Sequence, residues 1–192
     1  GMDTHEVLAR FALERQTLAL LDHPGIARIL DAGRTAAGRP FLVMDHVAGQ
    51  PIRAYCDERR LDTRARLELF AKVCDAVQYA HQKGILHRDL KPSNLLVTDR
   101  DGAPFPVVID FGVAKLLGAR LGETLLTLPG SVLGTPEYMS PEQASNDADL
   151  DTRTDVYSLG ATLYELLTDS LPIDGKTLRS RGVGEALRRE EP

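Results

Sequence analysis

Apolar residues recur at helical spacing in two long segments of the chain. Residues 64–83 carry the clearer pattern, and Gly84 follows at a position where helices commonly end. The second pattern opens near Asp155. Both patterns are typical of buried helices. The predicted apolar stripes are Leu67, Phe70, Val73, Cys74, Val77 and Ala80 in the first helix, and Val156, Leu159, Leu163, Leu166 and Leu167 in the second.

A third helical pattern lies near the N-terminus and includes Val7, Phe11, Leu18 and Leu21. A D-x-x-E sequence precedes it and resembles a capping box, and an HPG turn ends it. Short apolar segments bounded by Gly, Pro and Asp predict strands between the helices. These predicted strands are residues 26–31, 40–47, 95–97 and 107–109.

Composition and charge narrow the class of protein. The net charge of -5 argues against a nucleic-acid-binding protein, which would normally present a basic surface. The two cysteines, Cys56 and Cys74, form no C-x-x-C motif and fit a reducing cytosol, so we predict a cytoplasmic location. No signal-peptide pattern opens the chain, and no apolar run is long enough to cross a bilayer. We therefore predict no membrane segment in this chain, which leaves open an anchor further along a longer parent protein.

Two polar loops carry residues that neither core packing nor helix periodicity explains. One reads HRDLKPSN and includes Asp89, Lys91 and Asn94, and the other is a DFG sequence that begins at Asp110. Asp89 can accept the proton of an attacking hydroxyl, and Lys91 lies two residues on, within reach of a transferred phosphate. Asn94 and Asp110 offer oxygen atoms, which are ligands that suit Mg²⁺. Each motif is weak alone, but their order and spacing indicate phosphoryl transfer from Mg²⁺·ATP.

Two further motifs complete a pattern that resembles the protein kinase superfamily. Residues 134–142 read GTPEYMSPE, similar to the end of an activation segment, and DVYSLG opens the second long helix. The four motifs in this order resemble those of bacterial eukaryotic-type serine/threonine protein kinases. This resemblance implies a kinase-like α+β fold that is mainly α. It places part of the N-lobe in residues 1–47, with helix C and two strands, and part of the C-lobe in residues 48–192.

The resemblance also implies roles for individual residues around ATP. Thr135 is expected to bond to Asp89 and Lys91 and to help seat the substrate hydroxyl. The expected ATP-binding residues are Met44 as gatekeeper, Asp45 and Val47 in the hinge, Leu96 beneath the adenine, and Glu14 as the helix C glutamate.

Further family positions concern packing and regulation. The resemblance implies that His87 is a packed core residue, stacked with Leu18, Ile29 and Phe111 and anchored by Asp155. Arg88 resembles the arginine of kinases that are switched by activation-loop phosphorylation. The candidate phosphate acceptors are Thr124, Thr127 and Ser131.

Some family features are missing from the sequence. No G-x-G-x-x-G motif precedes the hinge, and Lys72 and Lys83 lie on the first long helix, so Glu14 has no lysine partner in this chain. The helical base of the C-lobe is also missing. We therefore expect a partial kinase domain with weak ATP affinity and turnover, and with exposed apolar faces that favour self-association.

Two functions remain in competition at this point. The first is a protein serine/threonine kinase catalytic fragment, an enzyme that transfers the ATP γ-phosphate to Ser or Thr hydroxyls of a protein substrate. The alternative is a truncated pseudokinase that acts as a protein-binding or regulatory module. The intact HRD and DFG motifs favour the enzyme, and the missing N-lobe elements favour the binding module. A strand ending in A-V-K, encoded just before Gly1, would indicate that the chain is a fragment of a complete kinase.

Overall fold

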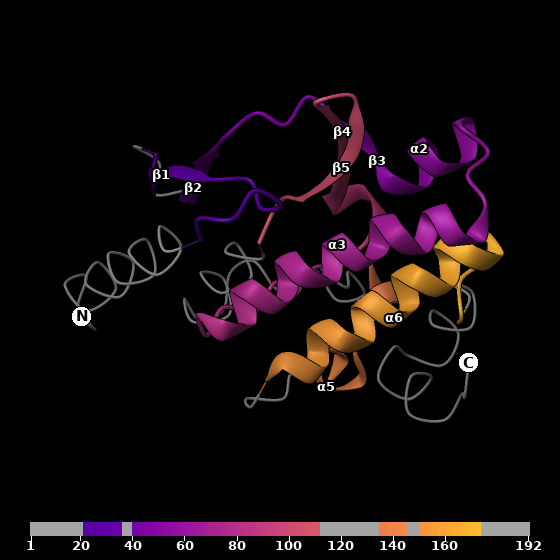
Figure 1. The fold of residues 1–192 in the computed structure, drawn as a ribbon. Coiled ribbons are helices and arrows are strands. Elements are labelled where there is room, and N and C mark those ends of the chain that lie inside the picture. Colours follow the sequence, from indigo (N-terminus) through magenta and orange to yellow (C-terminus); the bar gives the residue numbers. More distant parts are fainter. Residues whose placement is uncertain (1–20, 36–39, 112–134, 146–149, 174–192) are drawn as a thin grey trace, which may run out of the picture.

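The computed structural model describes residues 21–35, 40–111, 135–145 and 150–173 of the 192-residue chain. Its longest elements are two helices that run side by side (Figure 1). The helices are α2 (Ile52–Glu58), α3 (Thr63–Gln82), α5 (Pro141–Ala144) and α6 (Thr152–Thr168), with the 3₁₀ helices η1 (Pro92–Asn94) and η2 (Pro136–Tyr138). The strands are β1 (Ile29–Arg34), β2 (Pro40–Met44), β3 (Gln50–Pro51), β4 (Leu95–Arg100) and β5 (Ala103–Val108).

The ends of α3 and α6 follow from local chemistry. Asp62 caps α3, because its carboxylate accepts a hydrogen bond of 2.8 Å from the backbone N–H of Ala65. Gly84 has a φ of 74°, a left-handed conformation that glycine adopts without strain, and it stops the helix where the sequence predicted. Asp151 caps α6 in the same way, through a bond of 2.9 Å from the N–H of Arg153.

The predicted apolar stripes are partly wrong. Leu67 of α3 is exposed, and Val156 of α6 is 60% exposed. Leu167 is exposed as well. The buried face of α6 is instead mostly polar, and consists of Thr154, Asp155, Ser158, Ala161, Thr162, Glu165 and Leu166. The predicted Leu159, Leu163 and Leu166 do pack against the apolar core. The polar residues of this face lie against loops, whose backbone and side-chain polar groups need partners that apolar residues could not supply.

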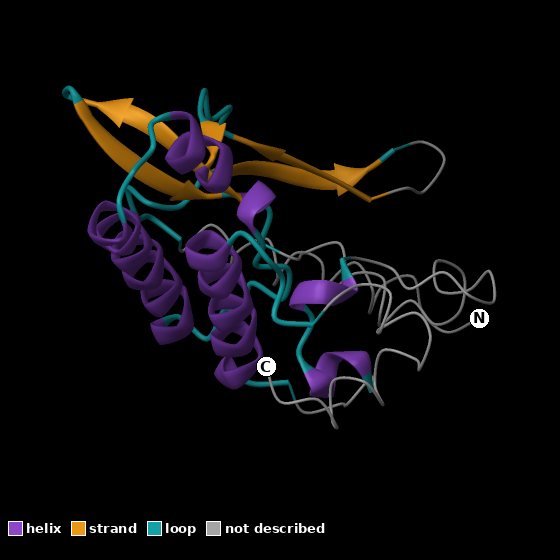
Figure 2. Ribbon diagram, turned by 90° about the vertical axis from the view of Figure 1, so that its right-hand side faces the viewer, coloured by secondary structure: helices purple, strands orange, loops and turns teal. Residues whose placement is uncertain are grey.

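The strands form a layer on one side of α3 and α6 (Figure 2). β4 and β5 make an antiparallel hairpin, longer than the two predicted strands, and β3 pairs with the other edge of β4. The two-residue turn of the β4–β5 hairpin consists of Asp101 and Gly102. Both have positive φ, which matches the twist of the two strands. Asp99 accepts a bond of 2.9 Å from the N–H of Gly102, which fixes this turn.

The β1–β2 pair is a separate antiparallel hairpin with a bulge between Ile29 and Asp31. The strand predicted at residues 26–31 begins only at Ile29, and Ile26 before it forms an isolated parallel bridge with Val108 of β5. Ala27 donates to the Val108 carbonyl at 2.9 Å, and Val108 donates to the Gly25 carbonyl at 2.8 Å. These bonds attach residues 25–27 to the end of the β4–β5 hairpin, just before the loop that contains Asp110.

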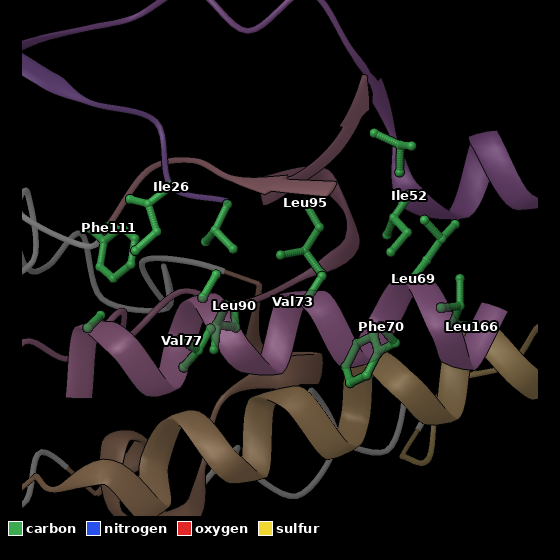
Figure 3. Close-up of a cluster of buried hydrophobic side chains, with 14 of the residues drawn as sticks. Ile26, Ile52, Leu69, Phe70, Val73, Val77, Leu90, Leu95, Phe111 and Leu166 are labelled. Atoms are coloured by element: carbon green, nitrogen blue, oxygen red, sulfur yellow. The ribbon is translucent and has the colours of Figure 1, made fainter. Parts of the chain in front are cut away.

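One apolar core joins these elements. It lies between α3, α2 and the β4–β5 hairpin, and Leu166 extends it to α6 (Figure 3). Leu90, in the middle of the loop that connects α3 to β4, and Leu95, the first residue of β4, are fully buried in it. Their burial fixes the HRDLKPSN sequence of this loop at Leu90, within it, and at Leu95, directly after it. In the part of the chain that the structure describes, no helix is long and apolar enough to span a bilayer.

Candidate active site

The loop between α3 and β4 brings four polar side chains together. Lys91 Nζ lies 2.9 Å from Asp89 Oδ2 and 3.5 Å from Thr135 Oγ1. Asn94 Nδ2 donates to the backbone carbonyl of Asp89 at 2.8 Å and to Oδ2 at 3.1 Å. The Asp89 carboxylate is therefore oriented by a cation and an amide. It is only half-buried, so it stays accessible from solvent.

Arg88 and Asp110, on either side of this cluster, have left-handed backbone conformations, with φ of 65° and 60°. Such a conformation costs a non-glycine residue roughly 1–2 kcal/mol, so the surrounding structure must hold it in place. Ile109 supplies part of that support, because its N–H donates to the Asn94 carbonyl at 2.9 Å. The same bond brings the segment that carries Asp110 next to Asn94.

Asp155 of α6 holds the loop between α3 and β4 in place through hydrogen bonds. Its side chain is completely buried, and it accepts hydrogen bonds from the backbone N–H of His87 (2.7 Å), the backbone N–H of Arg88 (2.8 Å) and His81 Nε2 (2.7 Å). Burial alone would raise the pKa of Asp155, but these three donors outweigh it and lower the pKa below its ordinary value. The carboxylate is therefore ionised and fixes the backbone just before Asp89.

His87 is a fully buried core residue, as predicted, and it also has two polar partners. Its ring packs against Phe111 with 4.6 Å between centroids. Nδ1 accepts from the N–H of Asp89 at 3.2 Å, so Nε2 must carry the hydrogen and donate to the Ile109 carbonyl at 3.0 Å. Burial lowers the pKa of His87, which keeps the imidazole neutral in this arrangement.

The segment 135–145 is attached to α6 by a second polar network. Ser158 Oγ donates to the Tyr138 carbonyl at 2.7 Å, and the Tyr138 hydroxyl donates to Glu165 at 2.5 Å. Glu165 also pairs with Arg53 of α2. Burial and the bond to Glu165 raise the pKa of Tyr138, so the phenol stays protonated and acts as a donor. This network holds the segment that carries Thr135 at a fixed distance from α6.

Of the residues predicted to meet adenine, Met44 ends β2, Asp45 and Val47 lie between β2 and β3, and Leu96 lies on β4. Asp45 donates its N–H to the Arg28 carbonyl at 2.9 Å, so of its two backbone polar groups only the carbonyl remains for a ligand. Val47 accepts a bond of 2.9 Å from the N–H of Gly49. A Cβ on Gly49 would lie 3.1 Å from the Cβ of Leu96, so the chain passes close to β4 here. The Val47–Gly49 turn and Leu96 are therefore neighbours.

Comparison with known proteins agrees with this geometry. The sequence model of the protein kinase domain family matches residues 2–188 of this chain. The chain belongs to the protein kinase family. The resemblance inferred from the four motifs is confirmed, and so is the kinase-like fold.

Similar proteins place this kinase domain among bacterial serine/threonine kinases. It is 41% identical over 188 residues to serine/threonine-protein kinase Pkn1 of Myxococcus xanthus, covering 97% of this chain and 26% of that protein. It is 39% identical over 170 residues to PknB of Mycobacterium leprae, covering 86% of this chain and 26% of PknB. The chain thus spans about a quarter of the length of these two relatives.

Solved kinase domains give the same result for the fold. The crystal structure of the Mycobacterium tuberculosis PknI kinase domain superposes with a TM-score of 0.64 at 30% identity, covering 93% of this chain and 61% of that one. A double mutant of the same domain gives a TM-score of 0.67 at 27% identity, and the superposition covers 96% of this chain and 72% of the mutant.

The structure of this kinase domain brings the three residues predicted for catalysis and one predicted metal ligand together. Asp89, Lys91, Asn94 and Thr135 form one cluster, in which Thr135 contacts Lys91, one of its two expected partners. Sequence reasoning missed His81 and Glu165, whose partners are distant in sequence. The predicted residues that lie outside the described part of the chain are Glu14, Leu18, Thr124, Thr127 and Ser131.

Proposed function

We propose that this chain carries the phosphoryl-transfer site of a serine/threonine protein kinase, which moves the γ-phosphate of ATP to Ser or Thr hydroxyls of a protein substrate. The observation that supports this most directly is the Asp89 cluster, with the Lys91 ammonium 2.9 Å from the Asp89 carboxylate and 3.5 Å from Thr135 Oγ1. Kinase catalysis depends mainly on positioning and charge neutralisation, and these residues can supply both.

Each residue of the cluster has a distinct part in the proposed reaction. Asp89 accepts the proton of the substrate hydroxyl while the hydroxyl oxygen bonds to the γ-phosphorus and the bond to the ADP oxygen breaks. Lys91 offsets the negative charge on the transferred phosphate. Thr135 seats the hydroxyl beside these two groups.

Asn94 and Asp110 are the residues that would hold Mg²⁺. Their amide and carboxylate oxygens suit this ion, which commonly takes one or two protein ligands together with phosphate and water. The bond from Ile109 to the Asn94 carbonyl supports this pairing, because it draws the two segments together. When bound, Mg²⁺ neutralises charge on the phosphate oxygens.

The adenine would lie against the β2–α2 connection. We assign the gatekeeper position to Met44, the hinge to Asp45 and Val47, and the floor beneath the base to Leu96. The close passage of Gly49 over Leu96 supports this assignment, since it places hinge and floor side by side. Glu14 keeps its proposed role as the helix C glutamate.

The division into lobes and the location of the protein are part of the proposal. The β1–β2 hairpin precedes residue 48, and α3, the catalytic loop and α6 follow it, which supports N-lobe and C-lobe parts at 1–47 and 48–192. Cys56 and Cys74 are free thiols, which supports the reducing environment of the cytoplasm as the proposed location.

Self-association is proposed from exposed apolar side chains. Val156 and Leu167 lie on α6, and Leu30, Phe41 and Val43 lie on the β1–β2 hairpin. Apolar surface of this kind favours association in water. We expect the sedimentation coefficient of this chain to increase with protein concentration. A constant monomeric value up to high concentration would contradict the proposal.

The test of the proposed function is transfer of labelled γ-phosphate from ATP to this chain and to a generic basic protein. The assay is run with Mg²⁺ and with EDTA. It is repeated on the chain preceded by the glycine-rich loop and lysine strand of a solved relative, because ATP binding is expected to be weak without them. Mg²⁺-dependent label on Ser or Thr supports the proposal. Label on Tyr alone, or no transfer by either protein, would overturn it.

A further inference from the structure

The peptide group that joins Arg88 to Asp89 is held at both of its polar atoms. Its N–H, on Asp89, donates to His87 Nδ1 at 3.2 Å. Its carbonyl oxygen, on Arg88, accepts from Gln143 Nε2 at 2.9 Å. The preceding N–H, on Arg88, donates to Asp155 Oδ1 at 2.8 Å. Three side chains, two of them from beyond the loop itself, therefore fix the backbone from which Asp89 projects.

This support is needed because Arg88 is left-handed, with a φ of 65°. A non-glycine residue keeps this conformation only where its surroundings favour it over the ordinary one. Rotation of the Arg88–Asp89 peptide group would move the Asp89 carboxylate directly. A misplacement of about 1 Å in a reacting group can reduce a rate by about 10²-fold.

Gln143 uses the two ends of its side-chain amide for different contacts. Its oxygen accepts a bond of 3.2 Å from the N–H of Ser140, while its own backbone N–H donates to Ser140 Oγ at 3.3 Å. These two bonds form a capping box at the start of α5. The nitrogen of the same amide is then directed to the Arg88 carbonyl. One side chain thus ties the start of α5 to the catalytic loop.

Little space remains around this contact. A cavity of about 10 Å³ is lined by Gln143, Asp89, Lys91 and Thr135 together with neighbouring residues. This is room for no more than about one water molecule. The Arg88–Asp89 peptide group therefore cannot turn far without disturbing the residues proposed to bind the substrate hydroxyl.

We infer that Gln143 is a positioning residue for phosphoryl transfer, which acts on Asp89 through the Arg88 carbonyl. The inference rests on the proposed function. It adds a route by which the conformation of residues 135–145 controls the catalytic loop: when this segment moves away, the Arg88 carbonyl loses its donor and Asp89 loses its orientation.

The experiment uses Gln143→Glu, which separates the two contacts. A glutamate keeps the oxygen that caps α5, and it is a common residue at this position of a capping box. It cannot donate to the Arg88 carbonyl when ionised. Gln143→Leu loses both contacts, and Gln78→Glu on the exposed face of α3 is the matched control for the charge change.

We expect Gln143→Glu to lower kcat by roughly 10- to 100-fold without changing KM for ATP, because the hinge is not involved. Its Tm should shift by less than about 2 °C, and Gln143→Leu should lower both kcat and Tm. Hydrogen exchange at the Asp89 amide, measured by NMR, should become at least about tenfold faster in both variants. Gln78→Glu should match the parent in kcat, KM, Tm and hydrogen exchange.

Each outcome decides a separate question. Transfer by Gln143→Glu at the parent rate overturns the positioning role, whatever the exchange result. Unchanged exchange at Asp89 overturns the contact itself. If the parent transfers no phosphate in any form, the proposed function fails, and faster exchange in Gln143→Glu would still establish the link between α5 and the catalytic loop.

Discussion

Asp89→Asn is expected to reduce kcat for phosphoryl transfer by about 10³-fold. Asparagine has the same shape, and its oxygen can still accept the bonds that Lys91 and Asn94 donate to Asp89 Oδ2 at 2.9 and 3.1 Å. It cannot accept the proton of the attacking hydroxyl. The fold should therefore persist while the chemistry is lost. The measurement is the rate of label transfer from γ-labelled ATP with Mg²⁺, for parent and variant in the same form of the protein.

Asp75→Asn is the matched control for this change. Asp75 lies on the exposed side of α3, away from the catalytic loop, so the same substitution there should leave the transfer rate as it is. The proposed role of Asp89 would be wrong if its variant kept a tenth or more of the parent rate. A loss of activity in both variants would point to a general effect of removing negative charge.

The chemical part of the site could be predicted from sequence because it is local. Asp89, Lys91 and Asn94 lie within six residues, so their order along the loop determines which side chains can meet. The structure adds that Lys91 and Asn94 both contact the same oxygen of Asp89. Thr135 was assigned through the family motif rather than through spacing, and its contact with Lys91 is also present.

The supporting residues could not be predicted in this way. Gln143 meets Arg88 across 55 positions, and His81 meets Asp155 across 74. No periodicity in the sequence links such pairs. The left-handed φ of Arg88 could not be predicted from the sequence either, because arginine has no preference for this conformation. Positive φ at Gly84 and Gly102, by contrast, could be expected from the residue type.

The buried face of α6 shows why hydrophobic patterns mislead here. Val156 and Leu167 are apolar and exposed, whereas Asp155 and Glu165 are charged and buried. A pattern analysis assumes that helices bury apolar faces against apolar neighbours. α6 packs on the apolar core through Leu166, but it also lies against the catalytic loop and the segment 135–145, where its polar side chains bond to backbone groups. The helix is therefore part of the site as well as part of the core.

Asp155→Asn is expected to be the most destabilising of the substitutions considered, at about 3–5 kcal/mol of the free energy of unfolding. The Asp155 carboxylate is fully buried and accepts bonds from the backbone of His87, the backbone of Arg88 and the His81 ring. An amide in its place offers one acceptor atom instead of two, and it directs an N–H₂ group at donors. The free energy of unfolding is measured by urea denaturation at pH 7, with Asp75→Asn as the control, which should change it by less than about 0.5 kcal/mol.

The pH dependence separates loss of this charge from loss of packing. The pKa of Asp155 in the folded chain lies below its ordinary value of 3.8, because its three donors outweigh the effect of burial. The ionised carboxylate therefore contributes stability that is fully present above pH 3.8 and is lost as the pH falls through the folded-state pKa. In Asp155→Asn this contribution is absent at every pH, so the difference between parent and variant should shrink steadily below pH 3.8. A difference that stays constant down to the acid unfolding of the parent would show that packing rather than the carboxylate charge supports the catalytic loop.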